Sequence, residues 1–382
     1  MRFLTAGESH GPKLIGIIEG LPAGVVIRRE VIDESLGRRQ QGPGRGGRMA
    51  IEQDRVQILS GVRGGVSTGA PITLEIENRD FANWSQVMAV GEEADLVSRK
   101  VTAPRPGHAD LTGALKYRTD VRNILERASA RETAMRVAVG SVARQLLSAL
   151  SVNIRGRVLS VGDVRVKAAE SPGLWEDVQA SQWAMGDPEA ERAADELVSK
   201  ARAKGESLGG VIEIQALKVP PGLGSHVQWD RKLDGRLAQA VLSVQAIKGV
   251  EFGLGFEAGS RFGSQVHDPI DYRPGVGFGR LSNHAGGIEG GMSNGEPIIL
   301  RAVMKPIPTL YHPLPTVHLE TKEKLTASVE RSDVCAVPAA RVVLEQVVAW
   351  TLAQAVLEKF PADSFAELQA AWDDYQVYLK SV

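Results

Sequence analysis

The segment from about Asp120 to Leu150 restricts the fold more than any other part of the chain. Its pattern predicts one long helix, with apolar and small residues over much of its circumference. A helix of this kind is expected to be mostly buried, so other elements must enclose it. A second long helix is predicted over about residues 338–357, and an apolar fraction of 43% is enough for a substantial core.

Strands and helices alternate along the rest of the chain without a strict βαβ order. Asp187 before Pro188, and the capping box from Ser364 to Glu367, each predict the start of a helix. No linker rich in Pro and Ser divides the chain, so we expect one large α/β domain of the α+β type over residues 1–382. The other predicted elements are a hairpin in 1–27, strands at 56–59, 72–76, 152–166 and 210–219, helices at 30–39, 188–204, 230–244 and, amphipathic, about 364–380, and glycine-rich loops over 249–297.

Composition limits the classes of function. Lys and Arg number 45 against 46 Asp and Glu, a balance that argues against a dedicated nucleic-acid-binding protein. The single cysteine, Cys335, excludes an intrachain disulfide and fits a reducing compartment. The first residues do not resemble a signal peptide, and no apolar run approaches the ~18 residues that cross a bilayer. We therefore expect a cytoplasmic protein with neither a nucleic acid nor a membrane as partner.

The loop Gly7-Glu8-Ser9-His10-Gly11 places a carboxylate, a hydroxyl and an imidazole between two glycines. Apolar stretches flank the loop, so it is predicted to lie at the tip between two strands. Glycine lets the backbone approach a ligand closely, and histidine changes its charge near neutral pH. Taken alone, the loop fits either a catalytic site or an ordinary polar turn.

Residues 38–48 form a second unusual loop, which is rich in Gly and Arg. Such segments bind single-stranded nucleic acid when they repeat and carry aromatic residues, but this one occurs once and contains none. Its match to G-x-G-x-x-G follows a predicted helix rather than a strand, so it is not a dinucleotide fingerprint. The loop fits either a solvated segment or a lid that brings arginines onto a small polyanion, because guanidinium groups bind phosphate strongly. These arginines are Arg38, Arg39, Arg45 and Arg48.

Further polar clusters follow. Residues 105–110 place another imidazole on a Gly/Pro loop, and charges at 127–132 either bind a ligand or form structural ion pairs. Loops at 283–295, 305–309 and 331–335 combine bare backbone with Lys, Arg, hydroxyl and carboxylate groups, which suits a phosphorylated aromatic cofactor. No P-loop, G-x-S-x-G elbow or Cys/His cluster with metal-ligand spacing occurs, so no metal site is predicted.

The order and wording of these motifs resemble the chorismate synthase family. The resemblance extends from residue 3 to about 358, nearly the whole chain. It rests on GESHG at 7–11, GRRQQGPGRGGRM at 37–49, RPGHADLTGALKY at 105–117, RASARETAMRVAVG at 127–140, QAIKGVEFGLGF at 245–256, the loop at 283–295, KPIPT at 305–309 and RSDVCAVP at 331–338.

The resemblance implies a β-α-β-α sandwich fold, a homotetramer and a reaction. In that reaction 5-enolpyruvylshikimate-3-phosphate loses its 3-phosphate and a C6 proton by anti-1,4-elimination and gives chorismate, in the shikimate pathway of aromatic amino acid biosynthesis. Reduced FMN is the cofactor, although no net redox change occurs. A flavin- or NADPH-dependent oxidoreductase acting on a phosphorylated metabolite stays the alternative. No nucleotide-binding fold stands out, so we expect a separate flavin reductase as a partner.

The resemblance also implies catalytic roles. His10 resembles the histidine that protonates the departing phosphate, and His108 the histidine that acts on the reduced flavin. Asp333 resembles the carboxylate that relays the proton taken up at flavin N5 from substrate C6, with Ser9 and Ser129 in support.

Binding roles follow from the same resemblance. Many family members have Arg-Ser-Ser where this chain has Arg127-Ala128-Ser129, so any hydrogen bond assigned to Ala128 must come from backbone. The implied clamp for substrate phosphate and carboxylate is Arg39, Arg45, Arg48 and Arg105, of which Arg39 and Arg45 are also associated with NADPH. The implied FMN positions are Arg127, Ala128, Ser129, Gln245, Ala246, Gly290, Lys305, Pro306, Ile307, Pro308, Thr309 and Arg331.

Overall fold

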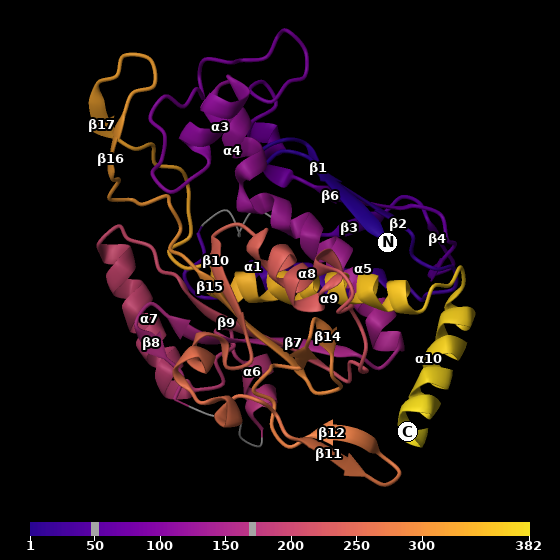
Figure 1. Ribbon diagram of the computed structural model, residues 1–382. Helices are drawn as coiled ribbons and strands as arrows, with labels where there is room; N and C mark the ends of the chain where they lie inside the picture. Colours follow the sequence, from indigo (N-terminus) through magenta and orange to yellow (C-terminus); the bar gives the residue numbers. More distant parts are fainter. Residues whose placement is uncertain (47–52, 168–172) are drawn as a thin grey trace.

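The computed structural model describes residues 1–46, 53–167 and 173–382. These residues form four layers in the order sheet, helices, sheet, helices (Figure 1). Helices α5 (Thr133–Ala149) and α9 (Val337–Lys359) pack against each other in the inner helical layer, α5 against the first sheet and α9 against the second. The layer order confirms the expected β-α-β-α sandwich.

The first sheet carries the predicted hairpin. Its antiparallel strands follow the order β1 (Arg2–Ala6), β2 (Lys13–Glu19), β6 (Ile72–Glu77) and β3 (Val56–Ile58). Every second residue of β2 is buried, as expected of a strand with one face on the core. The hairpin and both later strands are therefore confirmed, and the loop between β1 and β2 lies at one end of this sheet.

The second sheet has five antiparallel strands, and two predictions about it are wrong. The single strand predicted over 152–166 is two strands joined by a turn at Gly162, whose φ is 55°, a conformation that glycine adopts without strain. The region predicted as loops over 249–297 contains most of one edge strand of this sheet and two hairpins, because pairing with neighbours overrides weak local preference. The sheet order is β10 (Ile247–Phe252), β15 (Ile298–Met304), β9 (Gly210–Leu217), β7 (Asn153–Val161) and β8 (Val164–Arg165).

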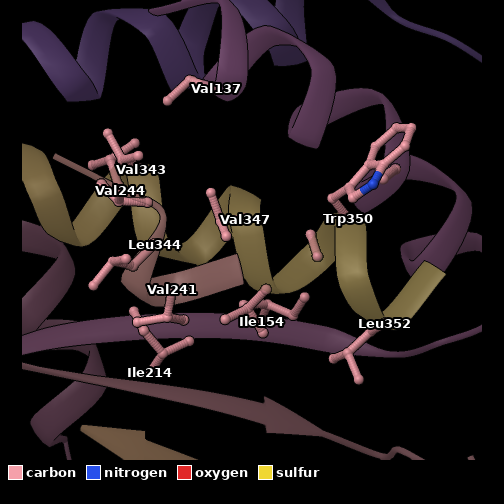
Figure 2. Packing of buried hydrophobic residues seen from close by; sticks show 14 of the residues in the cluster. Val137, Ile154, Ile214, Val241, Val244, Val343, Leu344, Val347, Trp350 and Leu352 are labelled. Atoms are coloured by element: carbon pink, nitrogen blue, oxygen red, sulfur yellow. The ribbon is translucent and has the colours of Figure 1, made fainter. Parts of the chain in front are cut away.

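The inner helices supply most of the core. Figure 2 shows Val343 and Val347 of α9 between Val137 of α5 on one side and Ile154 and Ile214 of the second sheet on the other. This layer also contains α1 (Arg29–Gln40) and α8 (Leu233–Leu242), which contact α9.

The long helix predicted from Asp120 to Leu150 is interrupted. Helix α4 (Val121–Ala128) ends at Ser129, where φ of −61° and ψ of 143° are extended, and α5 begins four residues later. The Ser129 hydroxyl accepts a hydrogen bond from the backbone N–H of Arg131. Serine competes for backbone hydrogen bonds in this way at helix starts, which explains the break. The interruption turns α4 away from the buried α5 and leaves Ser129 at the junction.

The outer helical layer covers the second sheet on the side away from α9. There the guanidinium groups of Arg155 and Arg157 stack over Trp175 of α6 (Leu174–Ala180). The predicted Asp187 cap forms, since its carboxylate accepts hydrogen bonds from two backbone N–H groups at the start of α7 (Pro188–Ala203). The capping box at Ser364 and Glu367 also forms.

The remaining elements are α3 (Asp110–Tyr117), α6 (Leu174–Ala180), α7 (Pro188–Ala203), α10 (Phe365–Ser381), β4 (Val62–Arg63), β5 (Val66–Ser67), β11 (Ile270–Arg273), β12 (Gly277–Arg280), β13 (Ile288–Glu289), β14 (Met292–Ser293), β16 (Pro315–Val317), β17 (Lys324–Thr326) and the 3-10 turns η1 (Arg79–Asn83), η2 (Ala130–Glu132), η3 (Trp229–Arg231), η4 (Gly255–Ser260) and η5 (Gly263–Gln265).

Helix α9 is long and apolar enough to span a membrane by length and composition. Within the fold, however, 83% of its most apolar window is buried against other elements. Its apolar surface is therefore accounted for by the core of the protein.

Candidate active site

A cavity of about 700 Å³ opens where the β1–β2 loop, the junction of α4 and α5, and the loops at 305–309 and 331–333 meet. This volume lies in the range of pockets that hold cofactors or substrates, roughly 300–1,000 Å³. Both predicted catalytic histidines, His10 and His108, line it, as does Asp333. The folded chain therefore gathers into one cavity residues that lie more than three hundred positions apart in the sequence.

The tip of the β1–β2 hairpin is held firmly in place. The side-chain amide of Asn78 donates hydrogen bonds of 2.9 and 2.7 Å to the carbonyl oxygens of Ser9 and Gly11. The backbone N–H of Ser9 donates to the carbonyl of Glu126, and its hydroxyl lies 3.0 Å from that of Ser129. The loop is therefore part of the cavity wall and not a solvated turn.

His10 lies between a carboxylate and an aromatic ring. Its Nδ1 is 2.8 Å from Oε1 of Glu126, and its backbone N–H donates to Oε2 at 2.8 Å. The imidazole stacks on Trp84 with ring centroids 3.8 Å apart. Burial alone would raise the pKa of Glu126, but the hydrogen bonds from His10 and the charge of Arg122 outweigh burial and hold that pKa below its usual range. Glu126 is therefore an ionised partner for the imidazole.

His108 has a different electrostatic environment. Its Nδ1 lies 2.5 Å from Asp110 and 3.1 Å from Nη2 of Arg105. Arg105 in turn binds both oxygens of Asp110, at 2.8 and 3.1 Å. Burial would raise the pKa of Asp110, yet the hydrogen bonds from His108 and Arg105 hold it well below its usual range. The negative charge beside His108 is thus shared with a permanent cation.

The predicted clamp arginines gather on one side of the cavity. Arg45 binds Asp333 at 2.5 Å, and the other oxygen of Asp333 accepts from the backbone N–H of Gly46 at 2.6 Å. Arg39 is buried beside Thr133, with Nη1 3.6 Å from Asp54. Burial lowers the pKa of Arg39 to about 10, although the charge of Asp54 acts in the opposite direction.

A further guanidinium adds to this charge. Arg131 binds the same Asp54 carboxylate at 2.6 Å, so it shares one counter-charge with Arg39. With Arg45, Arg99, Arg105 and Arg331, six guanidinium groups line the cavity. The lining carboxylates are Asp80, Glu330 and Asp333, and Asp54 and Asp110 pair with lining arginines. An excess of guanidinium over carboxylate charge suits a phosphorylated or multiply charged ligand.

The positions expected to contact FMN supply hydrogen-bonding groups to the same cavity. Gln245 has a buried Oε1 with no hydrogen-bond partner among the described residues, although its Nε2 lies 3.3 Å from Glu132. Ala246 has a φ of 68°, in the left-handed region that non-glycine residues rarely adopt. Lys305 binds the carbonyl of Gly107 at 2.5 Å, and Thr309 accepts from Arg105 at 2.9 Å. Cavity walls also include Ala128, Ser129, Ile307, Pro308 and Arg331.

Three predicted FMN residues lie elsewhere. Arg127 donates its guanidinium hydrogen bonds to the β1 strand and loop, at Thr5 and Gly7. Pro306 and Gly290 are exposed, and among the described residues neither lines the cavity. Arg48 falls outside the described residues.

Sequence reasoning missed several residues that build the site. Glu126, Asp54 and Trp84 surround the predicted residues, and Asp80 is buried in the wall with an Oδ2 that lacks a hydrogen-bond partner among the described residues. Glu126 had a detectable signal, since it directly precedes the charged cluster at 127–132, in a run that then becomes a buried helix. Over the described ranges, no group of three or more His, Cys, Asp or Glu side chains forms a metal site.

Comparison with known proteins identifies the relatives of this chain. A sequence model of the chorismate synthase family matches residues 1–357. Chorismate synthase of Desulfitobacterium hafniense (strain DSM 10664 / DCB-2) is 68% identical over 379 residues, covering 99% of each chain. That of Desulforamulus reducens is 58% identical over 386 residues and covers both chains completely. A crystal structure of chorismate synthase superposes with a TM-score of 0.81 at 43% identity, covering 100% of this chain and 98% of the other.

Proposed function

The chain belongs to the chorismate synthase family, and on this basis we propose roles for the residues that line its cavity. Its activity is that of the family, a carbon–oxygen lyase that eliminates phosphate from 5-enolpyruvylshikimate-3-phosphate to give chorismate. Members of the family use reduced FMN. The oxidoreductase alternative is not favoured.

We assign His10 to the departure of phosphate. A phosphate dianion leaves readily only when its charge is neutralised, and a proton donor beside guanidinium groups supplies that neutralisation. As the C–O bond breaks, its electron pair leaves with the phosphate, which takes a proton from His10. Arg39, Arg45 and Arg105 hold the substrate's anionic groups. The observation that carries this assignment is that His10, bound to an ionised carboxylate, shares one cavity with these arginines.

The C6 proton must be carried away from the substrate, and we assign Asp333 to the relay of that proton. Both of its oxygens accept hydrogen bonds, from Arg45 and from the N–H of Gly46, which keeps the carboxylate in one orientation. Its side chain is 20% exposed within the cavity wall. Ser9 and Ser129, which bind each other, support the His10 loop.

The cavity also fits the flavin. Reduced FMN supplies electron density that assists C–O cleavage, without net oxidation. The Oε1 of Gln245, which has no hydrogen-bond partner in the described part of the chain, would accept from a ring N–H, and the left-handed backbone at Ala246 would bring main-chain groups close to a flat ligand. Lys305, Thr309 and Arg331 would bind the polar groups of the cofactor, and His108 lies in the same wall.

The remaining assignments concern partners and location. We propose that the chain works as a cytoplasmic homotetramer, without nucleic acid or membrane as partner, and that Arg39 and Arg45 contact NADPH when it serves as reductant. No dinucleotide fingerprint follows a strand in this sequence, which supports a separate flavin reductase.

Replacing Gln245 by methionine is expected to weaken FMN binding about tenfold, because a neutral hydrogen bond is lost with little change in side-chain volume. Quenching of flavin fluorescence on titration of the protein measures the dissociation constant. Gln179→Met, at an exposed position on α6, is the matched control and should bind FMN normally. Equal affinity of both variants would remove Gln245 from the flavin site.

A further inference from the structure

Glu126 is a buried carboxylate whose two oxygens are both directed to one residue. The side chain is only 2% exposed, and it receives the backbone N–H of His10 on Oε2 and contacts the imidazole Nδ1 through Oε1. This bidentate arrangement fixes the imidazole relative to its own backbone. Stacking on Trp84 fixes the plane of the ring.

The geometry determines which nitrogen exchanges a proton with a ligand. A carboxylate only accepts hydrogen bonds, so Nδ1 must carry a proton where it meets Glu126. The proton that His10 gives to a ligand must therefore come from Nε2. A histidine that gives up the Nε2 proton while Nδ1 keeps its own does so from the imidazolium form.

Other charged groups lie close to Glu126 and Trp84. Arg122, on the same helix α4, approaches Oε1 of Glu126 only at 3.5 Å and is also bound to Glu330 at 3.2 Å. Arg99 and Arg122 lie over the Trp84 ring, 4.7 and 5.2 Å from its centroid. The partial neutralisation of Glu126 by Arg122 contrasts with the bidentate Arg105 on Asp110 beside His108.

We propose that Glu126 is the positioning residue that fixes the orientation and tautomer of His10, so that Nε2 is the nitrogen that donates to the ligand. The proposal rests on the assignment of His10 as proton donor to the departing phosphate. The proposal also distinguishes His10 from His108, because the carboxylate next to His108, that of Asp110, is already paired with the guanidinium of Arg105.

Glutamine at position 126 would reverse the arrangement. Its single oxygen must face the fixed backbone N–H of His10, which places the NH₂ group against Nδ1. An NH₂ group donates hydrogen bonds, so Nδ1 becomes the acceptor and the imidazolium form is disfavoured. We expect Glu126→Gln to lower kcat about 10- to 100-fold with little change in KM, and Glu126→Asp, which retains the charge, to recover part of the loss.

A measurement independent of turnover distinguishes this role from a purely structural one. Diethyl pyrocarbonate acylates only the neutral imidazole, and mass spectrometry of the His10 peptide gives its rate at each pH. The pH of half-maximal rate is expected to be lower in Glu126→Gln than in the wild type and to stay near the wild-type value in Glu126→Asp. Glu34→Gln, an exposed change on α1, serves as the control for both assays.

An unchanged midpoint in Glu126→Gln would overturn the proposal, as would equal activity of Glu126→Gln and the control. If Glu126→Gln does not fold, a midpoint in Glu126→Asp that falls by a unit or more would overturn it instead. Suppose that the midpoint falls in Glu126→Gln as expected but His10→Ala is fully active. That result would contradict the assigned role of His10 as proton donor and would leave the contact between Glu126 and His10 supported.

Discussion

Replacing His10 by alanine is expected to lower turnover about 10²–10⁴-fold, the usual contribution of a general acid or base. That loss corresponds to roughly 3–5 kcal/mol of transition-state stabilisation. The physical reason is that phosphate must then leave without a positioned proton donor, although the arginines still neutralise part of its charge. Initial rates of chorismate formation at saturating substrate and reduced FMN measure the effect.

The matched control for this change is His226→Ala, because His226 is exposed and does not line the cavity. It should retain wild-type turnover. FMN affinity of His10→Ala should also stay normal, which separates a chemical defect from a folding defect. Turnover of His10→Ala within a factor of two of wild type would contradict the assignment of the proton donor.

Glu345→Gln is expected to destabilise the fold by about 3–5 kcal/mol, the loss seen when one partner of a buried ion pair is removed. Glu345 lies on α9 and is 1% exposed. Its carboxylate binds Arg38 at 3.0 Å, Arg144 at 3.2 Å and Arg341 at 3.0 Å. Glutamine leaves these guanidinium groups without a counter-charge. Denaturant unfolding at neutral pH measures the difference.

The same carboxylate predicts a pH dependence. Burial would raise the pKa of Glu345, but Arg341, Arg38 and Arg144 outweigh burial and hold it below the ordinary value of 4.5. A lowered pKa in the folded state stabilises the fold above that ordinary value, and the contribution disappears as pH falls through the folded pKa. The gap between wild type and Glu345→Gln should therefore be largest at neutral pH and narrow in acid.

Glu34→Gln on α1 makes the same chemical change at an exposed position and should alter stability by less than about 0.5 kcal/mol. Identical unfolding midpoints for Glu345→Gln and Glu34→Gln would show that the three arginines do not depend on Glu345.

Local signals in the sequence predicted much of the fold. The alternation at 72–76, the Asp187 cap and the capping box at Ser364 each act over a few residues, and each forms as expected. The break at Ser129 was missed because a single serine cap is a weak signal within a helical run, and the strand at 247–252 was missed because pairing with β15 decides it. The prediction of one domain over the whole chain stays a prediction.

The residues of the site likewise divide into those that the sequence predicted and those that it did not. The motif residues His10, His108 and Asp333 stand out by chemistry and do line one cavity. Their partners Glu126 and Trp84 carry no local signal of proximity to His10, since only the folded chain brings α4 and the residues after β6 against the hairpin tip. Gly290 is the converse case: the family resemblance predicts that it contacts FMN, but it does not line the cavity of the single chain.

The most direct test of phosphate elimination at this cavity is an anaerobic assay of the purified chain with reduced FMN and 5-enolpyruvylshikimate-3-phosphate. Product analysis and the flavin absorbance are followed together over many turnovers. We expect chorismate and phosphate to appear in equal amounts while the flavin is still reduced at the end. Oxidation of one flavin for each product molecule, or release of phosphate without chorismate, would contradict the account.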